Sequence, residues 1–390
     1  MIIKSLLDTD LYKLSMQKAV YHQFPHTMVE YEFKCRSGED LSPYYSEIKD
    51  EIKNWCSLVF SESELQYLNS ISYLKGDYVE YLKNYTPNFK YVEIHEKPFS
   101  IKVKGPWVET ILYEVPILAI VNEVYFRNKI SGKFCPADFY IKTKEQIDRV
   151  FRKILVANKN QIRFAEFGTR RRFSREWQED VVKYLYQYIN KDLFLGTSNV
   201  LLAKKYSIKP IGTQAHEWLQ SGQVLAPTLR ESQQFMLQKW AEEFRGSLGI
   251  ALTDTIGIKA FLNDFDKYFA NLYDGVRQDS GNPWEIGTKV INHYKSLGID
   301  PKTKSIIFSD NLNMTRAISL KQSFGEDINV SFGIGTNLTN DIPDTIPMSI
   351  VMKLQRVNDK PVAKISDEPE KAQCQDAEYL KLVKKEFGIQ

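Results

Sequence analysis

From about residue 143 onward, short apolar runs alternate with longer segments whose apolar residues recur at helical spacing. Short apolar runs bounded by polar and glycine residues are typical of buried strands, and the longer segments are typical of amphipathic helices. We expect strands at residues 162–167, 193–197, 209–213, 250–253, 271–276, 304–309 and 329–333. We expect helices at residues 144–160, 175–190, 199–204, 229–244, 283–297 and 311–324. This alternation predicts a parallel sheet, and the number of units favours an α/β barrel over an open sheet.

The two ends of the chain follow a less regular pattern, in which strand-like runs of Val, Ile, Tyr and Phe partly alternate with polar residues. We expect strands at residues 28–36, 91–105, 349–355 and 361–365, and a buried helix at residues 107–128. Residues 357–360 form a turn signal between the last two strands. We therefore expect both ends to build a second, smaller α/β domain. The predicted parts are residues 1–125 and 343–390 for this domain and residues 126–342 for the barrel.

The composition narrows the class of protein. The chain has 390 residues, 43% hydrophobic and 26% charged, which is typical of a soluble globular protein with more than one core. The net charge of +3 and the absence of a Lys/Arg stripe argue against binding to nucleic acid. Asp8 and Asp10 interrupt any signal-peptide core, and no apolar run is long enough to span a membrane, so we expect a cytoplasmic protein. The cysteines lack metal-ligand spacing and are expected to be reduced thiols: Cys35, Cys56, Cys135 and Cys374.

Polar and glycine residues gather where the predicted strands end. The fragments are EFGTRR, GTSN, GTQAHE, TDTIG, YDGVRQDSGNP, SDNLN and FGIGTNLTND. One such fragment would be an ordinary turn. In α/β barrels, however, the loops after the strands build the active site. Seven fragments at the same topological position therefore predict a functional site.

Three fragments contain residues suited to phosphate chemistry. His216 in GTQAHE could act as a base or as a nucleophile toward a phosphoryl group, or be a structural histidine. Gly333, Gly335 and Thr336 could form a nest of backbone N–H groups for an anion, or simply a tight turn. Ser309 begins SDNLN, which could cap a helix or hold phosphate and ribose hydroxyls.

Other fragments supply charge and a flat ring. Arg277 could hold a carboxylate or phosphate, and Asp279 could bind ribose hydroxyls or magnesium, although the two could also pair with each other. Phe167 could stack on a flat substrate whose acidic group meets Arg170, or it could belong to the core. Asp254 is a second candidate ligand for magnesium, or a helix cap.

The motifs TDLYK, EFGTRRRFS, GTSN, GTQAHE, TDT, YDGVRQDSGNP and FGIGTNL resemble those of the nicotinate phosphoribosyltransferase family. Their order and spacing match from about residue 8 to about residue 340. The resemblance implies an irregular α/β barrel of the type II phosphoribosyltransferase kind, with a second α/β domain from both chain ends. It implies a homodimer with shared active sites. It also implies an enzyme of the ligase class that joins nicotinate to 5-phosphoribosyl 1-diphosphate, yielding nicotinate mononucleotide and diphosphate for NAD biosynthesis. ATP hydrolysis and Mg²⁺ would assist the reaction.

The resemblance also implies roles for single residues. His216 would be the phosphorylated histidine, and Arg277 and Asp279 would complete the catalytic set. Tyr12 would come from the other subunit and stack on nicotinate opposite Phe167. The remaining substrate contacts implied or expected are Arg170, Ser198, Thr213, Ser309, Gly333, Gly335 and Thr336.

Three alternatives stay open. Nicotinamide phosphoribosyltransferases are similar but place an acid where this chain has Ser198, so we expect nicotinate to be preferred. Quinolinate phosphoribosyltransferases use no ATP and need several basic residues, and no lysine occurs in the seven fragments that follow the predicted strands. A non-catalytic sensor of phosphoribosyl metabolites on the same scaffold is the third alternative, because fold alone does not prove activity.

Overall fold

The computed structural model describes residues 1–131, 136–368, 372 and 374–389, with the backbone alone for residues 130, 131 and 136–143. Cys135, predicted to be a reduced thiol, lies outside the described residues. The other three cysteines are free thiols. No helix in the described ranges is both long and apolar enough to cross a membrane.

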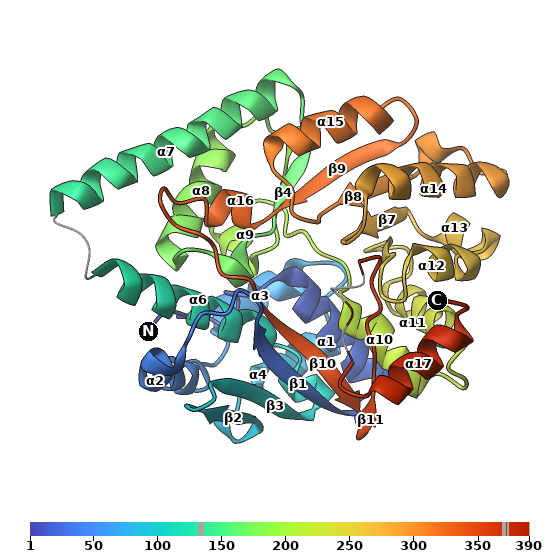
Figure 1. The fold of residues 1–390 in the computed structure, drawn as a ribbon, viewed down its shortest axis with the longest axis horizontal. Helices are drawn as coiled ribbons and strands as arrows, with labels where there is room; N and C mark the ends of the chain where they lie inside the picture. The colour runs from blue at the N-terminus through green and yellow to red at the C-terminus, as the bar shows by residue number, and fades with distance from the viewer. Residues whose placement is uncertain (132–135, 369–371, 373, 390) are drawn as a thin grey trace.

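A parallel sheet of six strands forms the upper part of the molecule (Figure 1). Its order is β5-β4-β9-β8-β7-β6, and each neighbouring pair is parallel. The bounds are Phe164–Glu166 for β4, Phe194–Thr197 for β5, Ile250–Leu252 for β6, Gly275–Gln278 for β7, Ser305–Phe308 for β8 and Asn329–Ile334 for β9. The predicted parallel α/β architecture is confirmed.

The two edge strands, β5 and β6, approach each other through residues 209–214. On one side, the N–H of Thr197 donates to the carbonyl of Lys209 and the N–H of Ile211 donates to the carbonyl of Thr197. On the other side, the side chain of Gln214 donates to the carbonyl of Ile250. The predicted strand at 209–213 is therefore an extended segment with a single bridge, Thr197 to Pro210. A proline has no N–H to offer a second ladder, which explains why the sheet is irregular here.

An antiparallel sheet of five strands lies below, in the order β11-β10-β1-β3-β2 (Figure 1). Its strands come from both chain ends, as predicted: β1 Met28–Cys35, β2 Val92–His95, β3 Ser100–Pro106, β10 Ile350–Val357 and β11 Lys360–Pro361. The predicted strand at 361–365 is wrong beyond Pro361. Asn358 and Asp359 turn the chain with positive φ angles, and after Pro361 the chain leaves the sheet and runs toward the parallel strands.

The helices before the parallel sheet are α1 Leu11–Gln23, α2 Tyr45–Trp55, α3 Glu62–Ser70, α4 Asp77–Lys83, α5 Trp107–Thr110, α6 Glu114–Ser131 and α7 Pro136–Lys159. The remaining helices are α8 Arg175–Tyr188, α9 Val200–Tyr206, α10 His216–Leu225, α11 Ser232–Phe244, α12 Ile258–Asp264, α13 Lys267–Leu272, α14 Pro283–Ser296, α15 Met314–Phe324, α16 Thr336–Thr339 and α17 Ala377–Glu386. The predicted domain boundary after residue 125 falls within α6, and the predicted division into domains stays a prediction.

Local chemistry explains where several helices begin. Ser174, Asn199, Asn282 and Asn313 each accept a backbone N–H from the first turn of α8, α9, α14 and α15. Asp266 caps α13 in the same way. The predicted strand at 271–276 is therefore wrong in its first half, because residues 271 and 272 end a capped helix and β7 starts at Gly275. The helical segments α10 and α12 were not predicted.

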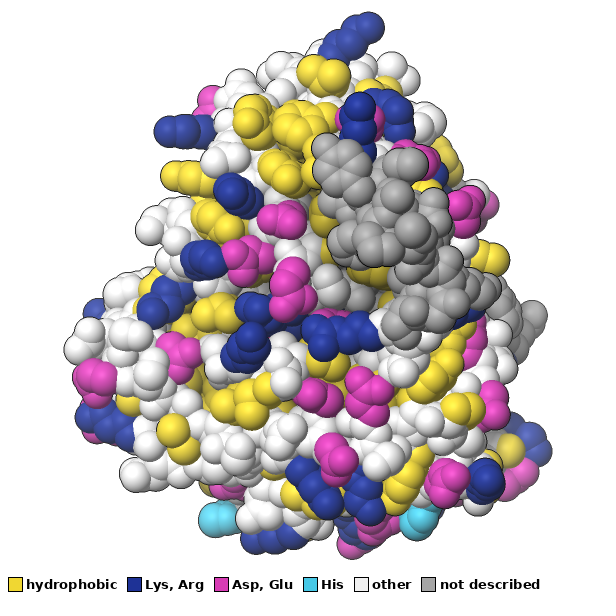
Figure 2. All heavy atoms as spheres, turned by 90° about the vertical axis from the view of Figure 1, so that its left-hand side faces the viewer, with side chains coloured by type: hydrophobic (Ala, Val, Ile, Leu, Met, Phe, Trp, Pro, Cys, Tyr) yellow, Lys and Arg dark blue, Asp and Glu magenta, His cyan; other side chains and the backbone are white. Residues whose placement is uncertain are grey.

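The face at the left of Figure 1 carries Lys, Arg, Asp and Glu side chains mixed with apolar ones (Figure 2). Basic and acidic side chains form a band across the middle of this face. The two signs lie side by side there, in keeping with the small net charge of +3.

Candidate active site

A cavity of about 410 Å³ lies between the carboxyl ends of the parallel strands and the antiparallel sheet. It contains most of the residues that the sequence predicted for a site. Those that line it are Phe167, Arg170, His216, Arg277, Asp279, Ser309, Gly333, Gly335 and Thr336. Residues from the ends of four strands, β4, β7, β8 and β9, and from the start of α10, which follows the extended segment, thus converge on one space, as the position of the motifs predicted.

His216 is the first residue of α10, and its ring is held by an acid. Its Nε2 atom lies 2.8 Å from Oδ1 of Asp254 and 3.9 Å from Oδ2 of Asp279. Burial lowers the pKa of His216 to about 4, so the ring is neutral at pH 7. A neutral ring whose Nε2 carries the hydrogen toward Asp254 has its lone pair on Nδ1. His216 is therefore arranged as a nucleophile or base at Nδ1.

Asp254 is fully buried, and both of its oxygen atoms are engaged. Besides His216, it meets the ammonium group of Lys364 at 2.8 Å and accepts a hydrogen bond of 2.6 Å from the hydroxyl of Ser280. Burial by itself would raise the pKa of Asp254, but His216 and Lys364 outweigh burial and hold this pKa well below its usual range. Asp254 is thus an ionised carboxylate that orients the histidine.

Asp279 and Arg277 face the cavity from β7 and the loop after it. The hydroxyl of Ser309 donates to Oδ1 of Asp279 over 2.7 Å, and Nη1 of Arg277 lies 3.8 Å from the same oxygen. Burial alone would raise the pKa of Asp279, but Arg277 and other nearby groups lower it to about 2. The distance between Arg277 and Asp279 is longer than a hydrogen bond, so Arg277 keeps donors for a bound anion.

Four cations at the cavity were missed by the sequence analysis as site residues: Arg36, Arg171, Lys353 and Lys364. Burial, together with the positive charges of Lys364 and Arg170, lowers the pKa of Lys353 to about 7. Burial likewise lowers the pKa of Arg171 to about 10. The clue in the sequence was a lysine inside each of two apolar runs, IVMKL and PVAKI, where a strand or a buried segment would otherwise be all apolar.

Two glycines allow Phe167 to reach its position. A Cβ atom on Gly333 would lie 2.4 Å from the ring of Phe167, and one on Gly335 would lie 2.7 Å from its carbonyl oxygen. Contacts this short are not tolerated, so both positions require glycine for packing. The predicted anion nest at these glycines and Thr336 stays a prediction, although all three border the cavity.

Three predicted substrate residues do not line the cavity of this chain. The hydroxyl of Ser198 donates to Oδ1 of Asp10 over 2.7 Å, and the carbonyl of Thr213 accepts from Ser15 over 3.0 Å. Tyr12, the second residue of α1, has a buried hydroxyl without a partner among the described residues. Burial raises its pKa well above the usual value. Within one chain, these residues attach the N-terminal segment to the parallel sheet.

The same N-terminal segment enters a buried polar network beside the cavity. Asp8 receives two hydrogen bonds from the guanidinium of Arg172, at 2.6 and 2.8 Å, and Arg172 also contacts Gln178. The side chain of Gln178 then donates to Glu166, whose pKa burial raises to about 7. Arg172 belongs, like Arg170, to the EFGTRRRFS motif, but their surroundings differ. Arg170 borders the cavity and lies 3.1 Å from Glu114, whereas Arg172 is fully buried and paired with Asp8.

The residues offer limited room for a magnesium ion. His216, Asp254 and Asp279 present ligand atoms within 4.8 Å of one another. Magnesium prefers oxygen ligands and usually keeps several waters or substrate phosphates. Asp254 already holds Lys364 and Ser280, whereas the one contact found for Oδ2 of Asp279 within the described part of the chain is His216 at 3.9 Å. Of the two predicted ligands, Asp279 fits better, as one contributor beside the substrate's own phosphates.

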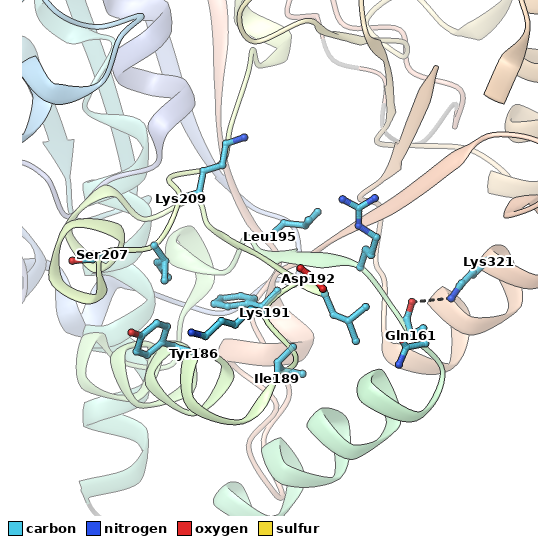
Figure 3. Close-up of a pocket in the computed structure, with 13 residues that line it drawn as sticks. Gln161, Tyr186, Ile189, Lys191, Asp192, Leu195, Ser207, Lys209 and Lys321 are labelled. Atoms are coloured by element: carbon cyan, nitrogen blue, oxygen red, sulfur yellow. Dashed lines mark hydrogen bonds between the residues drawn. The ribbon is translucent and has the colours of Figure 1, made fainter. Parts of the chain in front are cut away.

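A second hollow, of about 1000 Å³, opens at the opposite, amino ends of β4 and β5 (Figure 3). None of the predicted site residues lines it. Lys321 points to the carbonyl of Gln161 at the end of α7, and the C-terminus of α8 also lies at this hollow. Cations beside helix C-termini are favourable without any ligand, because helix dipoles are negative there. We therefore place the active site at the carboxyl ends of the strands.

A cationic cavity at the carboxyl ends of parallel strands is typical of α/β enzymes that bind phosphorylated substrates. Comparison with known proteins defines the family. Residues 162–390 match the nicotinate phosphoribosyltransferase (NAPRTase) family, and residues 7–122 match the N-terminal domain of that family. The chain therefore belongs to the nicotinate phosphoribosyltransferase family.

Individual relatives agree over the full length. The chain is 46% identical over 396 residues to a nicotinate phosphoribosyltransferase of Cupriavidus necator, covering 100% of this chain and 99% of that one. It is 47% identical over 399 residues to one of Burkholderia cenocepacia, covering 100% and 98%. Crystal structures of nicotinate phosphoribosyltransferases from Vibrio cholerae and Porphyromonas gingivalis superpose with TM-scores of 0.92 and 0.93, at 42% and 32% identity. These structures cover 100% of this chain, and the chain covers 95% and 100% of theirs.

Proposed function

We propose that the chain joins nicotinate to 5-phosphoribosyl 1-diphosphate, giving nicotinate mononucleotide and diphosphate, as a step of NAD biosynthesis. The observation that carries the proposal is the cavity itself, in which Phe167 lies beside an excess of cations at the carboxyl ends of the strands. Its acidic members are few: Asp279 is hydrogen-bonded to Ser309, and Asp310 also borders the space.

The chemistry needs charge neutralisation more than it needs a base. When the bond from ribose C1 to the diphosphate oxygen breaks, positive charge develops on the sugar and negative charge on the leaving group. Arg170, Arg277 and Lys353 border the cavity, and in the proposed reaction they stabilise the diphosphate. The ring nitrogen of nicotinate has a free lone pair and forms the new bond to C1 once it is correctly placed. In this proposal, Phe167 stacks on one face of the nicotinate ring and so helps to place it.

ATP coupling through His216 is part of the proposal. The lone pair on Nδ1 would attack the γ-phosphorus of ATP while the bond to the ADP oxygen breaks. Nε2 stays hydrogen-bonded to Asp254, whose negative charge stabilises the ring as it becomes positive during attack. The position of His216 at the start of α10 adds a favourable helix dipole for the phosphoryl group. Magnesium, when bound with ATP or phosphoribosyl diphosphate, would neutralise phosphate charge.

The proposal includes a cytoplasmic homodimer. Tyr12 does not line the cavity of its own chain, so its predicted stacking on nicotinate requires that a second copy bring it to the site. The proposed dimer therefore has a testable signature, which is that a Tyr12 variant and a His216 variant complement each other when mixed.

Nicotinate remains the proposed acceptor over nicotinamide. Ser198 contributes no charge, but its hydroxyl holds Asp10, so an acid does lie nearby. Burial raises the pKa of Asp10, which favours its neutral form and lessens repulsion of a carboxylate substrate. The prediction that the site lacks the lysines that quinolinate would need is wrong, because Lys353 and Lys364 line the cavity. Family membership now carries the preference for nicotinate.

The test is a product assay with phosphoribosyl diphosphate and magnesium, with and without ATP, using nicotinate, nicotinamide and quinolinate in turn. We expect nicotinate mononucleotide, formed faster with ATP. Comparable rates with nicotinamide would overturn the acceptor preference. Turnover of quinolinate without ATP would favour the decarboxylating alternative, and tight binding of phosphoribosyl diphosphate without any turnover would favour the sensor.

A further inference from the structure

The chain between the antiparallel sheet and α17 makes contacts that no substrate-binding role explains. We call residues 363–368 the strap. It begins where the chain leaves β11, and it runs along the loops that carry the histidine and its acids. The notable feature is that each of these loops is tied to the strap by at least one hydrogen bond.

The first tie is to α10, the helix that begins with His216. Gln223 of this helix donates its side-chain amide to the carbonyl of Ala363 at 2.7 Å and accepts the N–H of Ala363 at 2.8 Å. Tyr379 of α17 donates to the same Gln223 at 3.3 Å. Both backbone groups of one strap residue are therefore satisfied by the helix of the histidine.

The second tie is to the loop after β6, which carries Asp254. The N–H of Ile365 donates to the carbonyl of Thr255 at 2.9 Å, and Oδ1 of Asp367 accepts the N–H of Ile258 at 2.8 Å. One residue before the first of these contacts, the ammonium of Lys364 meets Oδ2 of Asp254 at 2.8 Å. The lysine is nearly as buried as the aspartate that it contacts, so the pair is shielded from water.

The third tie is to the loop after β7, which carries Asp279. The hydroxyl of Ser366 donates to the hydroxyl of Ser280 over 2.9 Å, and Ser280 donates in turn to Asp254. The N–H of Gly281 donates to Glu368 over 2.7 Å. Gly281 has a φ of 79°, and a Cβ there would lie 2.8 Å from Cβ of Asp367. Ser280 and Gly281 of the YDGVRQDSGNP motif therefore bind the strap.

The strap is held in place from outside by an apolar cluster. Ile365 and Ala363 pack in it with Val383 of α17, with Phe387 directly after this helix, and with Ile256 and Ala260 beside the Asp254 loop. This cluster is separate from the main core. Through this cluster, α17 packs the strap against the loops of the site.

We propose that the strap is a positioning element, in which Lys364 and Ser366 fix Asp254 so that His216 presents Nδ1 to the cavity. Lys364 acts through Asp254, and Ser366 acts through Ser280. The inference rests on the proposed function, because it concerns the phosphorylation of His216. It assigns the last segment of the chain to the ATP-coupled half of the reaction.

The experiment measures phosphohistidine formation from γ-labelled ATP in single turnovers, together with the affinity for a non-hydrolysable ATP analogue. Lys364→Met keeps much of the side-chain volume but removes the charge. We expect it to slow phosphorylation by about 10- to 100-fold, since hydrogen bonds to charged groups are the stronger kind. Affinity for the analogue should change much less. Lys364→Arg should recover a large part of the rate, because it restores a donor to Asp254.

Ser366→Ala separates positioning from direct contact, since Ser366 does not line the cavity. We expect a smaller slowing, of about 3- to 10-fold, again at unchanged analogue affinity. Lys304→Met is the matched control. Lys304 is also buried, but it is held by the carbonyls of Asn271 and Tyr273. These residues lie at the amino ends of the parallel strands, whereas Asp254 lies at a carboxyl end. This variant should phosphorylate at the wild-type rate per folded molecule.

Two results would overturn the inference. One is a Lys364→Met enzyme that loses analogue affinity while its phosphorylation rate at saturation is unchanged, which would make Lys364 a phosphate ligand. The other is wild-type phosphorylation in both strap variants. Failure of the proposed function is distinguishable, because the wild-type protein itself would then form neither labelled histidine nor nicotinate mononucleotide.

Discussion

The carboxyl end of the parallel sheet contains two polar regions that the motifs did not separate. In the cavity, Nη1 of Arg277 lies 3.8 Å from the nearest oxygen of Asp279, and Nη2 donates to the carbonyl of Gln214 over 3.4 Å, so the guanidinium has no close carboxylate partner among the described residues. In the buried network beside it, Arg172 and Asp8 bind each other through two short hydrogen bonds. Both regions use the same residue types from the same fragments. The difference teaches that a charged side chain without a close ion-pair partner at the cavity is available to bind substrate, whereas one paired inside the protein stabilises the fold.

The largest predicted effect is a loss of activity on substitution of Arg277 in the cavity. Arg277→Ala should lower kcat/KM by about 100- to 1000-fold, the range for losing one donor to developing negative charge. The thermal midpoint should hardly move, because the side chain has no close acid to leave behind. Steady-state kinetics and thermal unfolding measure the two quantities on the same sample.

The matched control is Arg316→Ala, in the first turn of α15 and outside the cavity. It should leave kcat/KM near the wild-type value. A large loss of stability in Arg277→Ala would show that the arginine is structural after all, and the contrast between the two regions would fail.

In the buried network of Asp8 and Arg172, we expect the opposite pattern, in which a substitution mainly lowers stability. Asp8→Asn removes the hydrogen-bonded counter-charge of the fully buried Arg172 and leaves only Glu123, at 3.9 Å, as a nearby carboxylate among the described residues. Breaking such a pair costs about 3–5 kcal/mol of unfolding free energy. Denaturant unfolding measures this loss. Lys205→Met, which removes an exposed pair with Glu179, should change stability by less than about 1 kcal/mol. Equal losses in both variants would contradict the assignment of the network.

A smaller effect tests the packing of Phe167. Gly333→Ala adds a Cβ 2.4 Å from the ring, so either the ring or the strand must shift. Overpacking of this kind costs about 1–3 kcal/mol. Because Phe167 borders the cavity, we expect the KM for nicotinate to rise more than the KM for phosphoribosyl diphosphate. An unchanged nicotinate KM would argue against stacking on this ring.

The smallest effect concerns pH. A histidine with a pKa of about 4 stays neutral well below the usual value of 6.5. Phosphorylation of His216 should therefore keep its rate as the pH falls from 7 to about 5.5, where an ordinary histidine would lose most of its neutral form. The unfolded chain binds the proton more readily, so stability falls as the pH drops from 6.5 toward 4. A rate that halves near pH 6.5 would contradict the buried, neutral ring.

The order of motifs after strands was enough to predict which loops meet. Phe167, Arg170, His216, Arg277, Asp279, Ser309 and Thr336 were each predicted and all border the cavity. Their position follows from a rule of parallel sheets, in which the carboxyl ends of the strands face one way. Sequence spacing alone carries that information.

The strap and its lysine could not be predicted in this way. Lys364 follows an antiparallel hairpin, and its approach to Asp254 depends on where the chain goes after Pro361. The packing of α17 sets this long-range placement, and no local sequence pattern reveals how α17 packs. The different surroundings of Arg170 and Arg172 could not be predicted either, because the partner of Arg172, Asp8, is distant in the sequence.

The central claim is that His216 couples ATP to the transfer of a phosphoribosyl group. The most direct measurement incubates the protein with γ-labelled ATP, locates the label by mass spectrometry, and follows nicotinate mononucleotide in parallel, for the wild type and for His216→Ala. The account predicts an acid-labile phosphoryl group on Nδ1 of His216 and product formation that ATP accelerates, with both responses absent in the variant. Acceleration by ATP that survives in His216→Ala, or a label on another residue, would contradict it.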